Sequence, residues 1–128
     1  VTYDFGEAFV AQNLVLEPVF DDLVTLELGR FAERNGDPLL GKLLFSLGED
    51  SAWHREFAAA LVRFAIEHRP HNRRLVEGWI ERWRGRVGDA VRALAPLFDR
   101  EEHEFSAELE ARRARLWESV GIDGSALP

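Results

Sequence analysis

Glycines and prolines divide this 128-residue chain into segments whose apolar residues recur every three or four positions. That spacing is typical of amphipathic helices, and the strict apolar–polar alternation that marks a strand does not occur. In residues 72–95, for example, Leu75, Trp79, Trp83 and Val87 follow one another at four-residue steps. The pattern predicts an all-α fold, with a helix in each long segment.

The predicted helix ends coincide with residues that cap or interrupt helices. Gly36 suits a left-handed stop, Asp37 an N-cap and Pro38 the first helical position. Pro70 and Pro96 each disfavour helical geometry in the residue before them. Helices are therefore expected to end just ahead of these two prolines.

A second stop-and-start signal lies at Gly48, which predicts a helix end, with Asp50 or Ser51 opening the next helix. Asp99 stands three residues before a glutamate, which is the spacing of a capping box, and Gly121 closes the last helix. The sequence thus predicts one all-helical domain. Its helices are expected over residues 4–34, 38–47, 51–68, 72–95 and 99–119, with a tail over 121–128.

The first predicted helix carries apolar residues over a wide arc, so it is expected to be buried on more than one side. Asn13, Glu17 and Asp21 form its polar stripe, one helical turn apart. For Glu17 and Asp21, a solvated stripe or a docking face is favoured over a pair of interacting carboxylates. Pro18 is expected to kink this helix, because its ring clashes with the carbonyl four residues back.

Composition and charge exclude several classes of function. The formal net charge of −7 argues against nucleic acid or an acidic membrane as a partner. The chain has no cysteine, which rules out disulfides, thiolate metal ligands and a catalytic thiol. It has no apolar run of about 18 residues, so the cytoplasm is the expected compartment. It also lacks methionine and begins with Val1, so a fragment or a processed product is expected.

The charges are unevenly distributed along the chain. Residues 1–29 carry six acidic side chains and no basic one, whereas residues 63–86 carry seven arginines and three glutamates. Solvated faces on different helices are the simpler interpretation, and complementary docking surfaces are the alternative.

The stretch EHRPH, residues 67–71, is the strongest candidate for a metal site. In helical carboxylate-bridged di-iron sites, Glu-x-x-His pairs place two ligands on one helix face. The four histidines are His54, His68, His71 and His103, and three positions before them stand Ser51, Ala65, His68 and Arg100. None of these positions holds a carboxylate, and Pro70 separates two of the histidines. A helix end without a metal-ligating role is therefore the favoured interpretation, and no metal ligand or catalytic residue is assigned to this chain.

The remaining sequence features do not indicate catalysis either. The consecutive residues Glu101, Glu102, His103 and Glu104 point around a helix, and acidic residues in a first turn suit the helix dipole without further purpose. No P-loop, nucleotide fingerprint or nucleophile elbow is present. The sequence therefore offers no catalytic motif.

Trp79 and Trp83 lie one helical turn apart, interleaved with Arg82, Arg84 and Arg86. Core packing is the default role for two aromatic residues at this spacing. Tryptophan and arginine are also the residues most enriched where one protein anchors on another. An apolar stripe bordered by guanidinium groups suits a protein partner that bears carboxylates.

Three stretches carry a family resemblance: NLVLEPVFDDLVTLELGRFAERNGDPLL, AALVRFAIE and LVEGWIERWRGRVGDAVRALAPLF. In order, they resemble the C-terminal part of the β (non-metal) hydroxylase subunit of bacterial multicomponent soluble di-iron monooxygenases. This group includes the phenol, toluene, alkene, propane and methane monooxygenases. The resemblance covers residues 9–98, and those β subunits are considerably longer than this chain.

The resemblance implies a ferritin-like helical fold without metal ligands. It also implies a non-catalytic, structural role beside a larger α hydroxylase subunit, which holds the di-iron centre and the pocket for a hydrocarbon or aromatic substrate. The complex would be an NADH-dependent oxygenase, and the presence of a γ subunit stays open. The residues expected at the subunit interface are Phe20, Trp53, Trp79, Trp83, Arg82 and Arg86.

Two alternatives come from other classes of protein. One is a free-standing α-helical ligand-sensing or regulatory domain whose aromatic side chains line a pocket. The other is a small helical metal enzyme, which the positions of the histidines disfavour.

Overall fold

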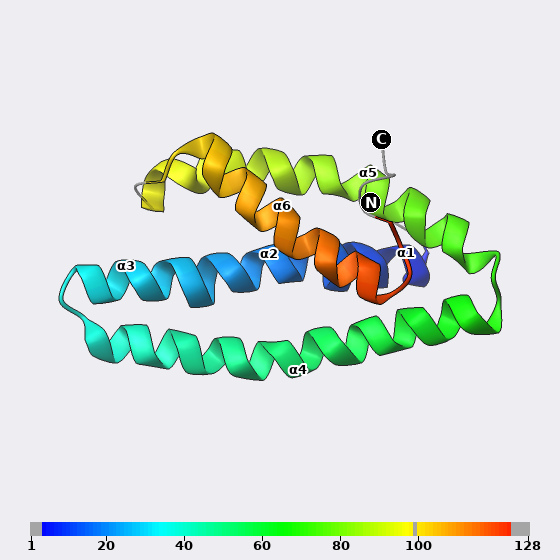
Figure 1. The fold of residues 1–128 in the computed structure, drawn as a ribbon, viewed down its shortest axis with the longest axis horizontal. Helices are drawn as coiled ribbons and strands as arrows, with labels where there is room; N and C mark the ends of the chain where they lie inside the picture. Colours follow the sequence, from blue (N-terminus) through cyan, green and yellow to red (C-terminus); the bar gives the residue numbers. More distant parts are fainter. Residues whose placement is uncertain (1–3, 99, 124–128) are drawn as a thin grey trace.

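A computed structural model describes residues 4–98 and 100–123, and all the regular structure in these residues is helical. A long first helix and α4 (Pro38–His68) run antiparallel, while α5 (Asn72–Leu94) and α6 (Glu102–Ser119) pack on the opposite side of the first helix (Figure 1). The all-α prediction is confirmed, and the arrangement is that of a ferritin-like helical bundle.

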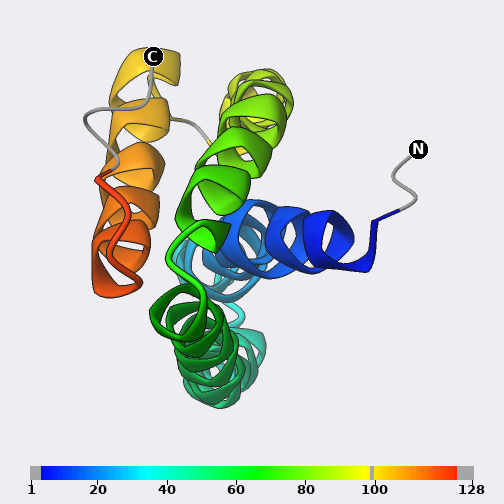
Figure 2. The same ribbon diagram turned by 90° about the vertical axis from the view of Figure 1, so that its right-hand side faces the viewer.

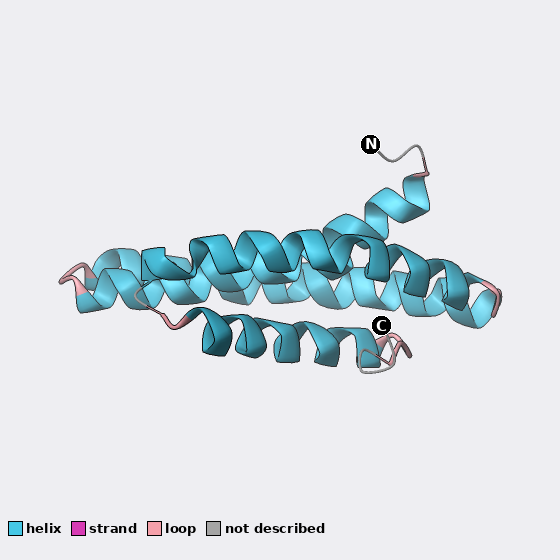
Figure 3. Ribbon diagram, turned by 90° about the horizontal axis from the view of Figure 1, so that it is seen from above, coloured by secondary structure: helices cyan, strands magenta, loops and turns pink. Residues whose placement is uncertain are grey.

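The first helix is continuous but not uniform. It comprises α1 (Phe5–Val10), the π-helical turn η1 (Ala11–Leu16), α2 (Glu17–Asp21), the π-helical turn η2 (Asp22–Glu27) and α3 (Leu28–Arg34). π-Helical turns often mark a bend or a functional part of a helix. Here one lies on each side of the short α2, which contains Pro18 near its start. The N-terminal end of the helix turns away from the line of the other helices (Figure 3).

The predicted helix break at Gly48 is wrong, because α4 runs unbroken from Pro38 to His68. Gly48 faces Thr25 of η2, and a Cβ at Gly48 would lie 2.9 Å from the Thr25 hydroxyl oxygen. This glycine therefore permits close packing of two helices and does not end one. The helices predicted over residues 38–47 and 51–68 are a single helix of 31 residues.

The other predicted stops are found close to where they were expected. Asp37 caps α4 by accepting a hydrogen bond from the Leu40 backbone N–H at 2.9 Å, and Gly36 has a φ of 85°. α4 ends at His68, two residues before Pro70. Gly121, with a φ of 82°, follows the end of α6.

The last helix begins later than predicted. α5 passes into a 3₁₀ turn, η3 (Ala95–Phe98), and α6 starts at Glu102, with Glu101 as its N-cap and no side-chain cap. The proposed cap, Asp99, lies outside the described residues, as do residues 124–128 of the predicted tail.

The buried apolar residues form two clusters. One contains Val10, Leu14, Val15, Ala59, Val62, Ile66, Val76, Ile80, Trp117, Val120 and Ile122, and the other contains Val19, Leu23, Val91, Ala95, Phe105 and Leu109. The first helix contributes to both, so it occupies the centre of the bundle (Figure 2). Its wide apolar arc is explained by neighbours on several sides.

Candidate partner-binding surface

A groove of about 640 Å³ runs between the first helix and α5. Its apolar lining includes Leu16, Phe20, Trp83 and Val87, and Arg86 stands at the same groove. Phe20 is 58% exposed, which is unusual for a phenylalanine in the helix at the centre of a bundle. The structure thus brings together three of the six residues expected at an interface.

Trp83 is held in place by a buried carboxylate. Its indole N–H donates to Glu7 Oε1 at 3.0 Å, and the Arg82 guanidinium donates to the same oxygen at 2.7 Å. Glu7 is only 7% exposed, so these charge-assisted contacts fix α1 on α5. The Arg86 guanidinium lies over the Trp83 ring, 5.0 Å from its centroid. Both arginines are exposed, but Arg82 is engaged by Glu7, whereas Arg86 lies beside the groove.

The other two predicted interface residues lie elsewhere. Trp79 is partly buried and lines a separate apolar cavity of about 280 Å³ with Phe9, Leu61 and Leu75. Trp53, on α4, is 73% exposed and lines neither of these hollows. The six residues therefore do not form one continuous site.

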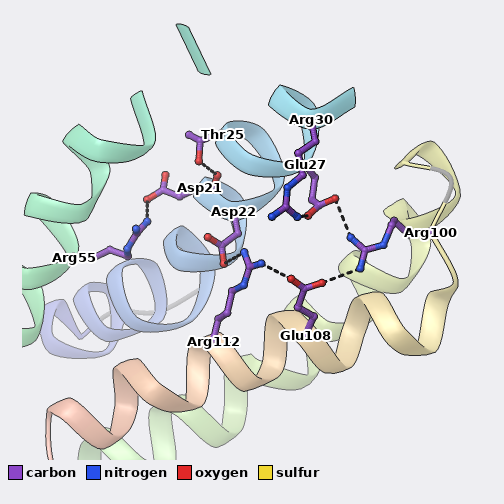
Figure 4. Close-up of polar contacts among 9 residues, drawn as sticks. All are labelled: Asp21, Asp22, Thr25, Glu27, Arg30, Arg55, Arg100, Glu108 and Arg112. Atoms are coloured by element: carbon purple, nitrogen blue, oxygen red, sulfur yellow. Dashed lines mark hydrogen bonds and ion pairs between the residues drawn. The ribbon is translucent and has the colours of Figure 1, made fainter. Parts of the chain in front are cut away.

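Several charged residues that the sequence left without partners are paired inside the bundle (Figure 4). Asp21 accepts from Arg55 of α4 at 2.8 Å. Glu27, 2% exposed, accepts from Arg30 at 3.0 Å and from Arg100 at 3.1 Å. The acidic stretch of residues 1–29 thus meets arginines of other segments of the same chain.

The same network continues to α6. Arg100 also donates to Glu108 at 2.8 Å, and Arg112 pairs with both Glu108 and Asp22, the latter at 3.4 Å. Figure 4 shows these side chains converging from η2, from α6 and from the segment that precedes α6. The sequence pattern gives no sign of this network, because the pairs bring together residues up to 90 positions apart, such as Asp22 and Arg112.

The pKa values of two carboxylates in the network are shifted in opposite directions. Burial raises the pKa of Asp22 above its ordinary value, although Arg112 and Arg55 oppose the effect. The hydrogen bond from Arg100 lowers the pKa of Glu108, despite partial burial. The arginines thus favour the ionised form of both carboxylates, but at Asp22 the effect of burial is larger.

The EHRPH stretch forms the end of α4 and the turn into α5. The His68 ring stacks on Phe64 with centroids 5.8 Å apart, and the Asn72 side-chain amide donates to the Ala65 carbonyl oxygen at 2.9 Å. Over residues 4–98 and 100–123, no three His, Asp or Glu side chains come together in a way that could hold a metal ion. The same residues include no helix long and apolar enough to cross a membrane.

The chain is thus a helical bundle with an apolar groove between the first helix and α5. Residues 1–69 match the model of the methane/phenol/alkene hydroxylase family. The chain belongs to that family, as the resemblance predicted.

Two curated proteins are similar to the chain. It is 40% identical over 91 residues, 71% of its length, to the hydroxylase component subunit beta of the toluene-4-monooxygenase system of Ectopseudomonas mendocina. It is 28% identical over 130 aligned positions to the hydroxylase component small subunit of propane 2-monooxygenase of Mycolicibacterium goodii. The matches span only 28% and 35% of these relatives. No solved structure matches the chain.

Proposed function

We propose that this chain is a non-catalytic, structural part of the β subunit of a multicomponent di-iron monooxygenase hydroxylase. Its two curated relatives are subunits of hydroxylase components by name, one from a toluene and one from a propane monooxygenase. In this role the chain braces a larger α subunit in the cytoplasm, and that subunit holds the iron and acts on a hydrocarbon or aromatic substrate.

The groove between the first helix and α5 carries this proposal. Phe20, Leu16 and Trp83 offer an apolar surface, and Arg86 offers a guanidinium that is pre-oriented by the indole beneath it. Central aromatic residues with arginine at the rim are typical of protein interfaces. The groove therefore suits an apolar helix face with a carboxylate at its edge, presented by the α subunit.

The proposal is tested by capturing the tagged chain from its host's lysate and measuring the intact masses and iron content of what is retained. We expect a larger, iron-bearing subunit in near-equal amount. Recovery of the chain alone, soluble and without iron, would contradict the proposal and favour the free-standing sensor.

A matched pair of variants assigns the surface. Phe20→Glu places a charge in the groove, whereas Leu97→Glu places one at a similarly exposed leucine, 66% against 58%, outside the groove. Phe20→Glu should lose the large subunit while Leu97→Glu retains it. Equal retention by both variants would mean that the groove is not the interface.

A further inference from the structure

Arginine side chains gather around a cavity between the first helix, α4 and α6. The cavity has a volume of about 220 Å³, and its charged lining residues are Asp22 of η2, Arg55 of α4, and Arg112 and Arg113 of α6. Four apolar residues complete the wall, namely Pro18, Val19, Leu109 and Leu116. Three of the four charged groups are positive, so the cavity favours an anion.

Arg113 is the most unusual of these residues, because it is only 2% exposed and is incompletely paired. Its Nη2 donates to Glu110, but its Nε and Nη1 have no hydrogen-bond acceptor among the described residues. Burial lowers the pKa of Arg113, the carboxylate of Glu110 opposes this effect, and the charge of Arg84 adds to it. A buried guanidinium with unused donors is costly, and it calls for an acceptor that the described part of the chain does not supply.

Arg112 adds another unused donor on the same wall. Its Nη2 donates to Glu108, whereas its buried Nη1 makes no hydrogen bond to a described residue and lies 3.4 Å from Asp22 Oδ2. A guanidinium carries five N–H donors in a planar fork. A small rotation of Arg112 or Arg113 therefore presents adjacent donors to the cavity, in the geometry that suits an oxyanion.

The size of the cavity indicates an ion and not a single water. Arg113 also borders a hollow of about 40 Å³, where the buried Ser106 hydroxyl has no hydrogen-bond partner within the described residues. One water fits there and can accept from Ser106 or from one nitrogen of Arg113. The larger cavity holds several times the ~30 Å³ that a water occupies in the liquid, so a polyatomic anion fits it. Such an anion also supplies the negative charge that water lacks.

Asp22 sets the condition under which an anion can enter. Its carboxyl lies between Arg55 and Arg112 (Figure 4). Burial raises its pKa, the two arginines oppose this effect, and the neighbouring Asp21 adds to it. An ionised Asp22 repels an anion, whereas a protonated carboxyl can donate its O–H to one. Anion binding and proton uptake by Asp22 therefore favour each other.

We propose that the cavity lined by Arg55, Arg112 and Arg113 is a binding site for a small oxyanion of the sulfate or phosphate type. The ion accepts from the unused N–H groups of α6 and joins α6 to η2 and α4, so its binding stabilises the folded chain. The site is separate from the groove that contains Phe20 and Trp83. Its occupation therefore does not depend on the proposed contact with another subunit.

The binding is tested by calorimetric titration of the full chain with sodium sulfate, at an ionic strength held constant with sodium chloride. We expect saturable binding, which Arg113→Met weakens by about tenfold or more. Methionine is similar in volume and apolar, so the buried position tolerates it, and circular dichroism checks the fold. Arg113→Lys keeps the charge but loses the planar fork, and it should also weaken binding.

Arg115→Met is the matched control, because it removes the same charge from an exposed position of α6 outside the cavity. It should leave the affinity for sulfate unchanged. Sulfate and phosphate that bind no better than chloride would overturn the proposal and leave the cavity to water. Equal weakening by Arg113→Met and Arg115→Met would also overturn it, because the ion would then respond only to the total charge of the helix.

The position of the ion is tested with Asp22→Asn, which removes the repelling charge and keeps the shape of the side chain. This variant should bind sulfate about fivefold more tightly than the parent at pH 7. The parent should bind more tightly as the pH falls toward about 5, and the variant should lose most of that gain. Sulfate does not titrate in this range, and the histidines are common to both proteins. An affinity at pH 7 that Asp22→Asn leaves unchanged would mean that no anion binds beside Asp22, and the proposed site would be wrong.

Discussion

The central first helix has one side covered by α6 and another side left open beside α5. On the covered side, Trp117 of α6 is 1% exposed and donates its indole N–H to the Leu14 carbonyl oxygen at 2.7 Å. On the open side, Phe20 is 58% exposed, although it belongs to the same helix. The chain thus covers one side of the first helix with its own α6, while the apolar surface around Phe20 stays exposed.

The charged groups on the two sides of the first helix also differ. On the covered side, Glu27, Arg100 and Glu108 link the first helix to α6 through ion pairs. On the open side, Arg86 stands over Trp83 at the solvent boundary. Glu27 is buried, and a buried carboxylate is costly unless its partners are present, so these ion pairs favour one arrangement of the first helix against α6. An apolar groove with a single guanidinium at its rim suits a contact made with another molecule.

The largest expected loss of stability comes from a substitution on the covered side, where α6 packs on the first helix. Trp117→Ala removes a fully buried side chain and leaves the Leu14 carbonyl without this donor, so the free energy of unfolding should fall by about 3–5 kcal/mol. Trp53→Ala, at a residue 73% exposed, should change stability by less than about 0.5 kcal/mol. Urea denaturation followed by circular dichroism measures both. A loss of stability for Trp117→Ala as small as that for Trp53→Ala would mean that the packing of α6 contributes little to the stability of the bundle.

The next effect concerns the buried carboxylate at the centre of the network. Glu27→Gln keeps the shape but removes the charge that Arg30 and Arg100 share, and it should cost about 1.5–3 kcal/mol. Glu17→Gln, on the open side at the groove, should cost less than about 0.5 kcal/mol. Thermal unfolding of the two variants compares the sides directly. A larger fall in the melting temperature for Glu17→Gln would mean that the open side, and not the covered side, depends more on its charge.

Two glycines distinguish close packing from an open helix face. A Cβ at Gly48 would lie 2.9 Å from Thr25 Oγ1, whereas a Cβ at Gly85 has nothing within 4 Å among the described atoms. Gly85→Ala should stabilise the chain by about 0.5–1 kcal/mol through helix propensity. Gly48→Ala should lose that gain and destabilise the chain, because Thr25 must shift. The unfolding midpoints in urea report both signs, and a stabilising Gly48→Ala would show that the contact with η2 adapts freely.

The helical class, most helix ends and the family were accessible from sequence, because capping residues and periodicity act over a few positions. Asp37 and Gly121 did what their residue types predict. Gly48 did not, since its role depends on Thr25, which lies 23 positions away. The interface residues were chosen by type, and type could not reveal that Arg82 would be engaged by Glu7 or that Trp79 would line another cavity. The ionic network could be recognised only from the three-dimensional arrangement.

The smallest expected effects lie within the covered side, where acid should affect two neighbouring carboxylates in opposite ways. The pKa of Glu108 is lowered in the folded chain, so its stabilising contribution is full above its unfolded pKa and is lost as the pH falls through the folded value. The pKa of Asp22 is raised, so the folded state holds its proton longer than the unfolded state, and stability falls as the pH rises through the folded value.

Glu108→Gln should therefore weaken the chain at pH 7, by less than about 1 kcal/mol at this partly exposed site, and the difference from the parent should vanish in acid. Asp22→Asn should be neutral or slightly stabilising at pH 7, because it removes a carboxylate whose burial costs more than its arginines return. Urea unfolding of the parent and both variants between about pH 3 and 8 measures the two differences. Equal losses of stability in the two variants at pH 7 would mean that both carboxylates stabilise the folded chain to the same extent. The predicted difference between Glu108 and Asp22 would then be wrong.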